Sequence, residues 1–178
     1  NEARQRATMS MIERDINQYC YKPAPTDKDQ VWSAEKDFYR YPSLLICNLK
    51  IYYNLSSFSA METLHYLRKH GYISTATGIA DDLRFLLYAA IYVRMKAYAF
   101  YDSQKEDVLV SKFYTSSSGV YAIPRPLVVM LTWVSQSLKD RVEYRVNNRL
   151  GDSHFTMEGC KSSRGARIAM RVPSAYCM

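Results

Sequence analysis

Apolar residues recur at three- and four-residue steps through most of the chain, which is the spacing of one face of an α-helix. This pattern predicts helices over residues 4–19, 42–54, 59–70, 74–101 and 127–150. The helix over 74–101 has the most regular pattern, and its expected inward set is Ile79, Leu83, Leu86, Leu87, Ala90, Val93 and Ala97. No strand pattern and no repeat of solenoid length stands out. The sequence therefore predicts an all-α fold, a bundle of about five to seven helices.

Residue types at the helix ends support these boundaries. Ser59 and Glu62 have the spacing of a capping box, in which each side chain binds the other residue's backbone N–H. Gly71 suits the position just after that helix, because glycine adopts the left-handed conformation at low cost. Ser74 is the expected N-cap of the longest helix.

The remaining segments define the domain. Pro42 has no N–H and fits the first turn of a helix, so a short helical turn over residues 33–40 is expected before it. Residues 108–114 either resume a helix or form an ordered loop. We expect one helical domain over residues 1–150 and an irregular basic tail over 151–178.

Composition indicates a globular and basic protein. Of the 178 residues, 48% are hydrophobic, and the formal net charge is +7 with a pI near 9.2. This charge permits an anionic partner such as a nucleotide, RNA or an acidic protein surface. The alternative is that the charge serves no ligand, as in many basic proteins. Sixteen tyrosines suit half-buried helix faces and protein interfaces.

Residues that could form a metal or catalytic centre are scattered. The four cysteines, at positions 20, 47, 160 and 177, contain no C-x-x-C pair, so reduced thiols and no zinc are expected. His65 and His70 are five residues apart and do not share a helix face. Asp81 and Asp82 fall in the first turns of a predicted helix, where acids favour the helix dipole.

The chain also lacks the patterns of an exported or membrane protein. Its first residues are charged, and no apolar segment of a signal peptide follows them. No apolar run approaches the roughly 20 residues that a membrane span needs. We therefore expect a cytoplasmic protein with no membrane span.

Two groups of basic residues are candidate binding sites, and the first precedes Pro42. Lys36 and Arg40 are four residues apart and share one face of a helical turn, with Tyr39 beside them. Arginine can hold a phosphate through two parallel hydrogen bonds, and lysine adds a mobile charge. These three residues are therefore candidates for nucleotide or phosphate binding. The alternative is that the two cations pair with Glu35, Asp37 or helix ends and only fix the packing.

The second group is a possible basic stripe. Arg141, Arg145 and Arg149 repeat every four residues along the last predicted helix. Such a stripe suits an anionic partner, but charges at this spacing are also typical of a helix face that is simply solvated.

An ordered series of segments resembles one known domain family. The series comprises K-D-F-Y-R-Y-P-S at 36–43, I-Y-Y-N-L at 51–55, the helical stretch 83–98 and S-Q-K-E-D at 103–107. It is similar to the helical domain that follows the catalytic domain in nucleotidyltransferases of the DUF294 and GlnD-like group, above all in versions joined to tetratricopeptide repeats. The resemblance covers about residues 9–110. Its specific parts are the K-x-x-Y-R-x-P-S and R-x-x-x-Y…Q-K-E-D stretches.

The resemblance implies an accessory helical domain that packs beside a nucleotidyltransferase-like domain or a repeat domain and helps it bind nucleotide or acceptor. The family's catalytic domain carries a Gly-Ser motif followed by paired acids that hold Mg²⁺. No such motif precedes Lys36, so Mg²⁺ and a nucleoside triphosphate are implied only for a separate catalytic domain, and no catalytic or metal residue is expected in this chain.

The family also carries a lysine and an arginine at a similar place near the active cleft, with glycines between them, where this chain has Phe38 and Tyr39. Two alternatives to the accessory role stay open. The first is a protein-docking module with no nucleotide role, and the second is an RNA-binding helical domain.

Overall fold

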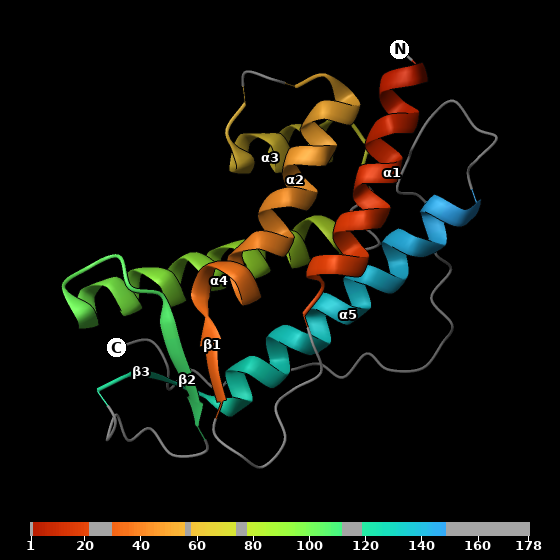
Figure 1. Ribbon diagram of the computed structural model, residues 1–178. Coiled ribbons are helices and arrows are strands. Elements are labelled where there is room, and N and C mark those ends of the chain that lie inside the picture. Colours follow the sequence, from red (N-terminus) through yellow and green to blue (C-terminus); the bar gives the residue numbers. More distant parts are fainter. Residues whose placement is uncertain (1, 22–29, 56–57, 74–77, 112–118, 149–178) are drawn as a thin grey trace.

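The computed structural model describes residues 2–21, 30–55, 58–73, 78–111 and 119–148 (Figure 1). Five α-helices dominate this part: α1 (Glu2–Tyr19), α2 (Arg40–Tyr53), α3 (Ala60–Lys69), α4 (Ile79–Tyr101) and α5 (Arg125–Asn148). A π-helix, η1 (Ala34–Tyr39), runs directly into α2. Three short strands complete the order: β1 (Gln30–Ser33), β2 (Asp107–Ser111) and β3 (Tyr121–Pro124). The predicted helical fold is confirmed.

The strongest sequence signals correspond to observed features. Every member of the inward set predicted for α4 is buried. At the start of α3, the Ser59 hydroxyl accepts a hydrogen bond from the Glu62 N–H at 3.3 Å, and the Glu62 carboxylate accepts one from the Ser59 N–H at 2.7 Å. Gly71, just beyond this helix, has φ of +72°. The capping box and the glycine stop are therefore confirmed.

The small sheet is a feature that the periodicity did not predict. β1 pairs antiparallel with β2, with Trp32 opposite Val108, and β2 pairs parallel with β3, with Val110 opposite Ile123. Residues 107–111 are thus a strand, and the expectation of a helix or loop from 108 onward is wrong there. Each strand has only four or five residues, which is too short for an alternating pattern to stand out.

The start of the longest helix also differs from expectation. α4 begins at Ile79, with Gly78 at the N-cap in the left-handed conformation at φ of +67°. Ser74, the expected N-cap, lies outside the described residues. Asp81 and Asp82 do fall in the first turn of α4, as predicted.

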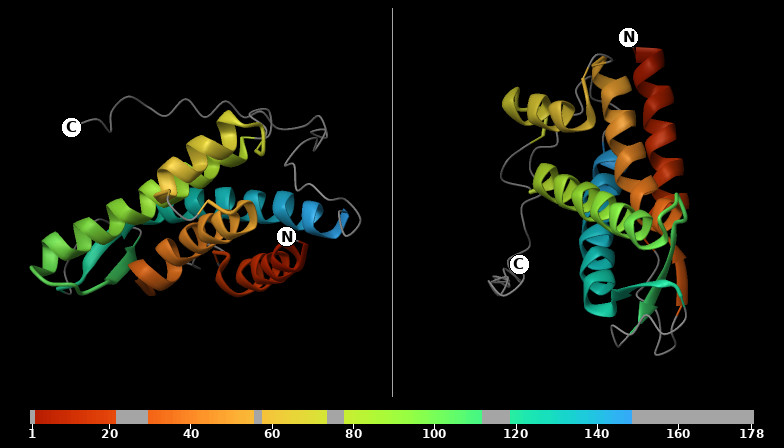
Figure 2. Two further views of the ribbon diagram at one scale, coloured as in Figure 1. Left: turned by 90° about the horizontal axis from the view of Figure 1, so that it is seen from above. Right: turned by 90° about the vertical axis from the view of Figure 1, so that its left-hand side faces the viewer.

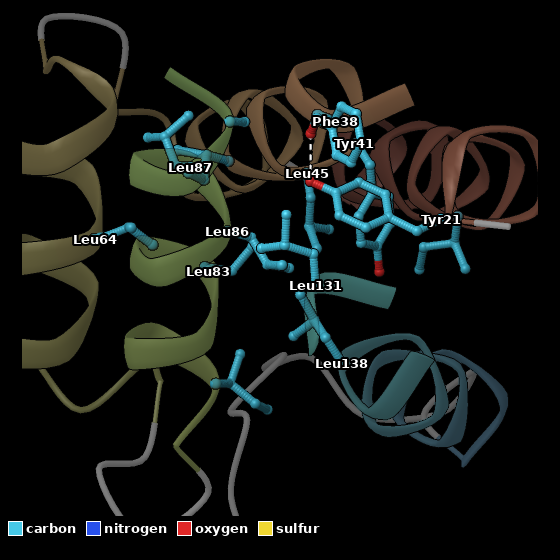
Figure 3. Close-up of a cluster of buried hydrophobic side chains, with 14 of the residues drawn as sticks. Tyr21, Phe38, Tyr41, Leu45, Leu64, Leu83, Leu86, Leu87, Leu131 and Leu138 are labelled. Carbon is cyan, nitrogen blue, oxygen red and sulfur yellow. Dashed lines mark hydrogen bonds between the residues drawn. The ribbon is translucent and has the colours of Figure 1, made fainter. Parts of the chain in front are cut away.

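One hydrophobic core joins the helices and the sheet. α1 and α2 lie side by side, and the sheet lies at one end of the helical body, beside the end of α4 and the start of α5 (Figures 1 and 2). Side chains from α2, α4 and α5 meet in the interior (Figure 3). A buried hydrogen bond of 2.9 Å from the Asn48 amide to the Asp15 carboxylate fixes α2 against α1.

Candidate functional site

The turn that carries the candidate residues Lys36, Tyr39 and Arg40 is η1, and it begins with a reciprocal cap. The Ser33 hydroxyl accepts a hydrogen bond from the Lys36 N–H at 3.2 Å, and the Ser33 N–H donates to the Asp37 carboxylate at 2.7 Å. The acid lies four residues after the serine, one more than in a capping box. This spacing fits the wider turn of a π-helix, a form that is frequent at functional sites.

The junction between η1 and α2 depends on a buried tyrosine. Pro42 has no N–H, so it cannot donate to the Phe38 carbonyl four residues before it, as a regular α-helix would require. The Tyr21 hydroxyl donates to that carbonyl instead (Figure 3). Tyr41 packs edge-to-face on Tyr21 at a ring distance of 5.9 Å. Tyr21, two residues beyond the end of α1, therefore completes the hydrogen bonds of this bend.

A second network closes the other side of η1. The Glu106 carboxylate accepts hydrogen bonds from Arg94 Nε at 3.0 Å and from Tyr98 Oη, and the Glu106 backbone carbonyl accepts one from the Ala34 N–H at 2.8 Å. Arg94 also lies over the Tyr39 ring, 4.7 Å from its centroid. The network thus connects α4, the segment before β2 and η1. The Glu106 carbonyl and the Ser33 hydroxyl therefore already accept from N–H groups at the start of η1 that an external anion would need.

The electrostatics of this network favour an ionised Glu106. Burial would raise the pKa of Glu106, but hydrogen bonds from Tyr98 and Arg94, together with the charge of Arg94, outweigh burial and lower that pKa. The same hydrogen bond to Glu106 raises the pKa of Tyr98, because the phenol must keep its proton to donate. Glu106 is therefore held as an anion. Its carboxylate serves a structural role, because it binds Arg94 and Tyr98.

The three candidate residues have different surroundings. Arg40 forms an ion pair with Glu35 at 3.1 Å and lies over the Tyr19 ring, 5.4 Å from its centroid. Tyr39 is covered by Arg94. The Lys36 side chain is exposed, and its ammonium has no ion pair among the described residues. Of the three, Lys36 alone is presented to solvent without a charged partner in this part of the chain.

The predicted basic stripe on α5 is only partly described. Arg141 is half-buried and forms an ion pair with Asp82 of α4, so this cation joins two helices. The side chain of Arg145 and the whole of Arg149 lie outside the described residues. Arg141 therefore has a packing role that the sequence did not indicate.

The outer face of α4 is a feature that sequence reasoning missed. Phe85, Tyr88, Tyr92 and Met95 are all exposed, at steps of three and four residues, and Met95 is 59% exposed. We call this set, with Asp81 and Ala99 at its two ends, the α4 stripe. Large exposed apolar patches usually mark interaction sites. The sequence signal was a second apolar period on the helix, on the side opposite its buried set.

The histidines and acids offer no metal centre in the described ranges. His65 on α3 and His70 directly after this helix are exposed, and they line a shallow hollow of about 490 Å³ together with Phe58 and Tyr66. The His70 ring lies 4.1 Å from the Tyr66 ring. Between residues 2 and 148, leaving out the gaps, no three histidine, cysteine, aspartate or glutamate side chains are placed to hold an ion.

Comparison with known proteins assigns no family to the chain: no protein-family model, no curated protein and no solved structure matches it. Within the described part, no helix is both long enough and apolar enough to span a membrane. The arrangement of η1 and α4 offers binding surfaces, namely the exposed Lys36 and the α4 stripe.

Proposed function

We propose that this chain is a non-catalytic helical accessory domain that acts by binding a second protein surface. The α4 stripe is the observation that carries this proposal. Aromatic and methionine side chains are enriched at the centres of protein interfaces, and the stripe consists mainly of such residues. Exposing these apolar side chains to water is unfavourable, and a partner surface packed on them would remove them from water.

The contacts within η1 also favour protein docking through α4 over phosphate binding at η1. The Glu106 carbonyl and the Asp37 carboxylate already accept hydrogen bonds from the Ala34 and Ser33 N–H groups at the start of η1, and Arg40 already has a carboxylate partner. A phosphate would have to compete with these internal acceptors. The exposed side chains of Phe85, Tyr88 and Met95 on α4 form no ion pair that a partner would have to displace.

The sequence resemblance suggests which partner this surface binds. In the proposed arrangement the domain packs beside a nucleotidyltransferase-like domain or a repeat domain. A second candidate function, help in binding the nucleotide or acceptor, is supported by the exposed Lys36 ammonium. Arg40 is 36% exposed and keeps donors directed to solvent, so it would assist Lys36. The RNA-binding alternative has the same two cations as its support.

Hydrogen exchange followed by mass spectrometry tests the proposed function. In the complete natural protein, peptides that cover residues 85–99 are expected to exchange more slowly than in the isolated chain, while peptides of α3 serve as the control. Equal exchange of α4 in both samples, with the α4 stripe still open, would refute docking through this face.

Titration calorimetry tests the second candidate. If η1 helps to bind phosphate, Mg²⁺–ATP or a short single-stranded RNA binds the complete protein, and the double change Lys36→Ala with Arg40→Ala weakens that binding by about tenfold. Lys69→Ala, an exposed lysine on α3, is the matched control. Unchanged affinity in the double variant, with the helical spectrum intact, would refute the phosphate role.

A further inference from the structure

The exposed face of α4 is bordered by positive charge. From Leu83 to Tyr101 the helix contains no aspartate or glutamate, and the next acid, Asp102, is the residue that ends it. Its charged residues in this range are Arg84, Arg94 and Lys96. Arg94 is committed to the carboxylate network beside η1, whereas Arg84 and Lys96 are exposed. At about 100° per residue, these two exposed cations lie on opposite borders of the α4 stripe.

The acid in the first turn of α4 does not neutralise this border. The Asp81 carboxylate is shared by two guanidinium groups, Arg68 of α3 at 3.1 Å and Arg84 at 3.3 Å, so this end of the stripe keeps a net positive charge. Near the other end, the Lys96 ammonium lies over the Tyr92 ring, 5.6 Å from its centroid, and has no ion pair among the described residues. Both ends of the stripe can therefore accept a carboxylate from outside.

We propose that the partner of the α4 stripe is a protein surface with an apolar centre and a carboxylate at each end of its rim. This inference rests on the proposed function and specifies the chemistry of the partner. One carboxylate pairs with Lys96, and the other pairs with Arg84 and Arg68 beside Asp81. A rise of about 1.5 Å per residue places Arg84 and Lys96 about 18 Å apart along α4, so the two carboxylates need about this separation.

The centre of the face fits an acidic protein better than a nucleic acid. A nucleic-acid strand is held by a row of cations along its backbone, with its bases stacked on aromatic rings. Here the positive charge is confined to the two ends, and the exposed surface between them includes Ile91 and Met95. Aliphatic and thioether side chains pack on an apolar protein surface, but they give a base no ring on which to stack.

Hydrogen exchange of α4 in the complete natural protein tests the acidic rim. The double change Arg84→Glu with Lys96→Glu should speed the exchange of residues 85–99 by about tenfold, because two attractions become repulsions. Raising NaCl from about 0.05 M to about 0.5 M should weaken the protection of the parent, since salt screens exposed charges. Arg6→Glu with Lys69→Glu is the matched control, because it changes the net charge equally at exposed positions on α1 and α3.

The isolated chain separates an effect on the partner from an effect on the helix itself. There the double change at Arg84 and Lys96 should leave the exchange of α4 at the parent's rate, and circular dichroism checks the fold of each variant. The inference is overturned if the double change has no effect in the complete protein, if the matched control has the same effect, or if the isolated chain responds equally.

A nucleic-acid partner is the remaining outcome to distinguish. Loss of α4 protection when the complete protein is treated with nuclease would overturn the inference and assign the face to a nucleic acid. Protection of α4 that ignores both charge reversal and salt would overturn the acidic rim alone and leave the proposed function standing. Equal exchange of α4 in the parent complete protein and the isolated chain would refute the proposed function and this inference with it.

Discussion

Two buried tyrosines beside the bend at Pro42 are expected to respond oppositely to the loss of their hydroxyl groups. Tyr21 is 2% exposed and Tyr41 is 1% exposed, and their rings are in contact. The Tyr21 hydroxyl donates to the Phe38 carbonyl, whereas the Tyr41 hydroxyl is buried with no hydrogen-bond partner among the described residues. The same chemical change, tyrosine to phenylalanine, therefore removes a bond in one case and an unsatisfied group in the other.

The magnitudes follow from the cost of unpaired buried groups. Tyr21→Phe leaves the Phe38 carbonyl without a donor, and a buried orphan acceptor costs about 1–3 kcal/mol. Tyr41→Phe removes a buried hydroxyl that makes no bond, so it should be neutral or stabilising by up to about 1 kcal/mol. For a chain of this size, 1 kcal/mol shifts the melting temperature by roughly 2–4 °C. Tyr21→Phe should thus melt several degrees below the parent, and Tyr41→Phe should melt at or above it.

The assay is thermal and urea unfolding of the full chain, followed by circular dichroism. Burial raises the pKa of both phenols, so both keep their protons, and the difference between the variants should be the same at pH 6 and pH 8. In a Pro42→Ala background, residue 42 regains an N–H that can donate to the Phe38 carbonyl, and the cost of Tyr21→Phe should fall. Equal destabilisation by Tyr21→Phe and Tyr41→Phe would refute the reasoning.

Three further predictions follow from the packing and the site. The pKa of Glu106 is lowered in the folded protein, so the stability that its carboxylate contributes is complete above its unfolded pKa and is lost as the pH falls through its folded pKa. The urea midpoint of the parent should therefore fall more steeply below about pH 4 than the urea midpoint of Glu106→Gln. Asn48→Ala removes a buried hydrogen bond to the Asp15 carboxylate and should cost about 2 kcal/mol in urea unfolding, while Cys47→Ala, an exposed neighbour on α2, should cost little. The purified chain should transfer no nucleotide from a labelled triphosphate with Mg²⁺, and turnover that disappears on changing Asp82 to alanine would contradict this.

Sequence periodicity predicted the helices well because each buries one regular face. In α4 the inward residues, from Ile79 to Ala97, repeat at helical steps, so their burial followed from spacing alone. The same helix carries the α4 stripe on its other side at the same steps. Apolar residues at helical steps usually belong to the core, so the spacing of the second apolar face of α4 did not distinguish it from a buried face.

The sheet and the networks around η1 needed three-dimensional information. The strands pair residues that are far apart in the chain, as when Trp32 lies opposite Val108. The helical turn before Pro42 was predicted from local signals. Its contacts with Arg94, Glu106 and Tyr21 join segments that no local rule connects, and these contacts determine how much of η1 is left for a ligand.

The methyl resonance of Met95 tests most directly whether the α4 stripe is a docking surface. In spectra recorded with ¹³C-labelled methionine methyl groups, the Met95 signal is expected to differ between the isolated chain and the complete natural protein, because a docked partner surface would cover this side chain. The signal of Met61, which is half-buried on α3, serves as the internal reference and should stay in place. A Met95 signal at the same position in both samples would contradict the account.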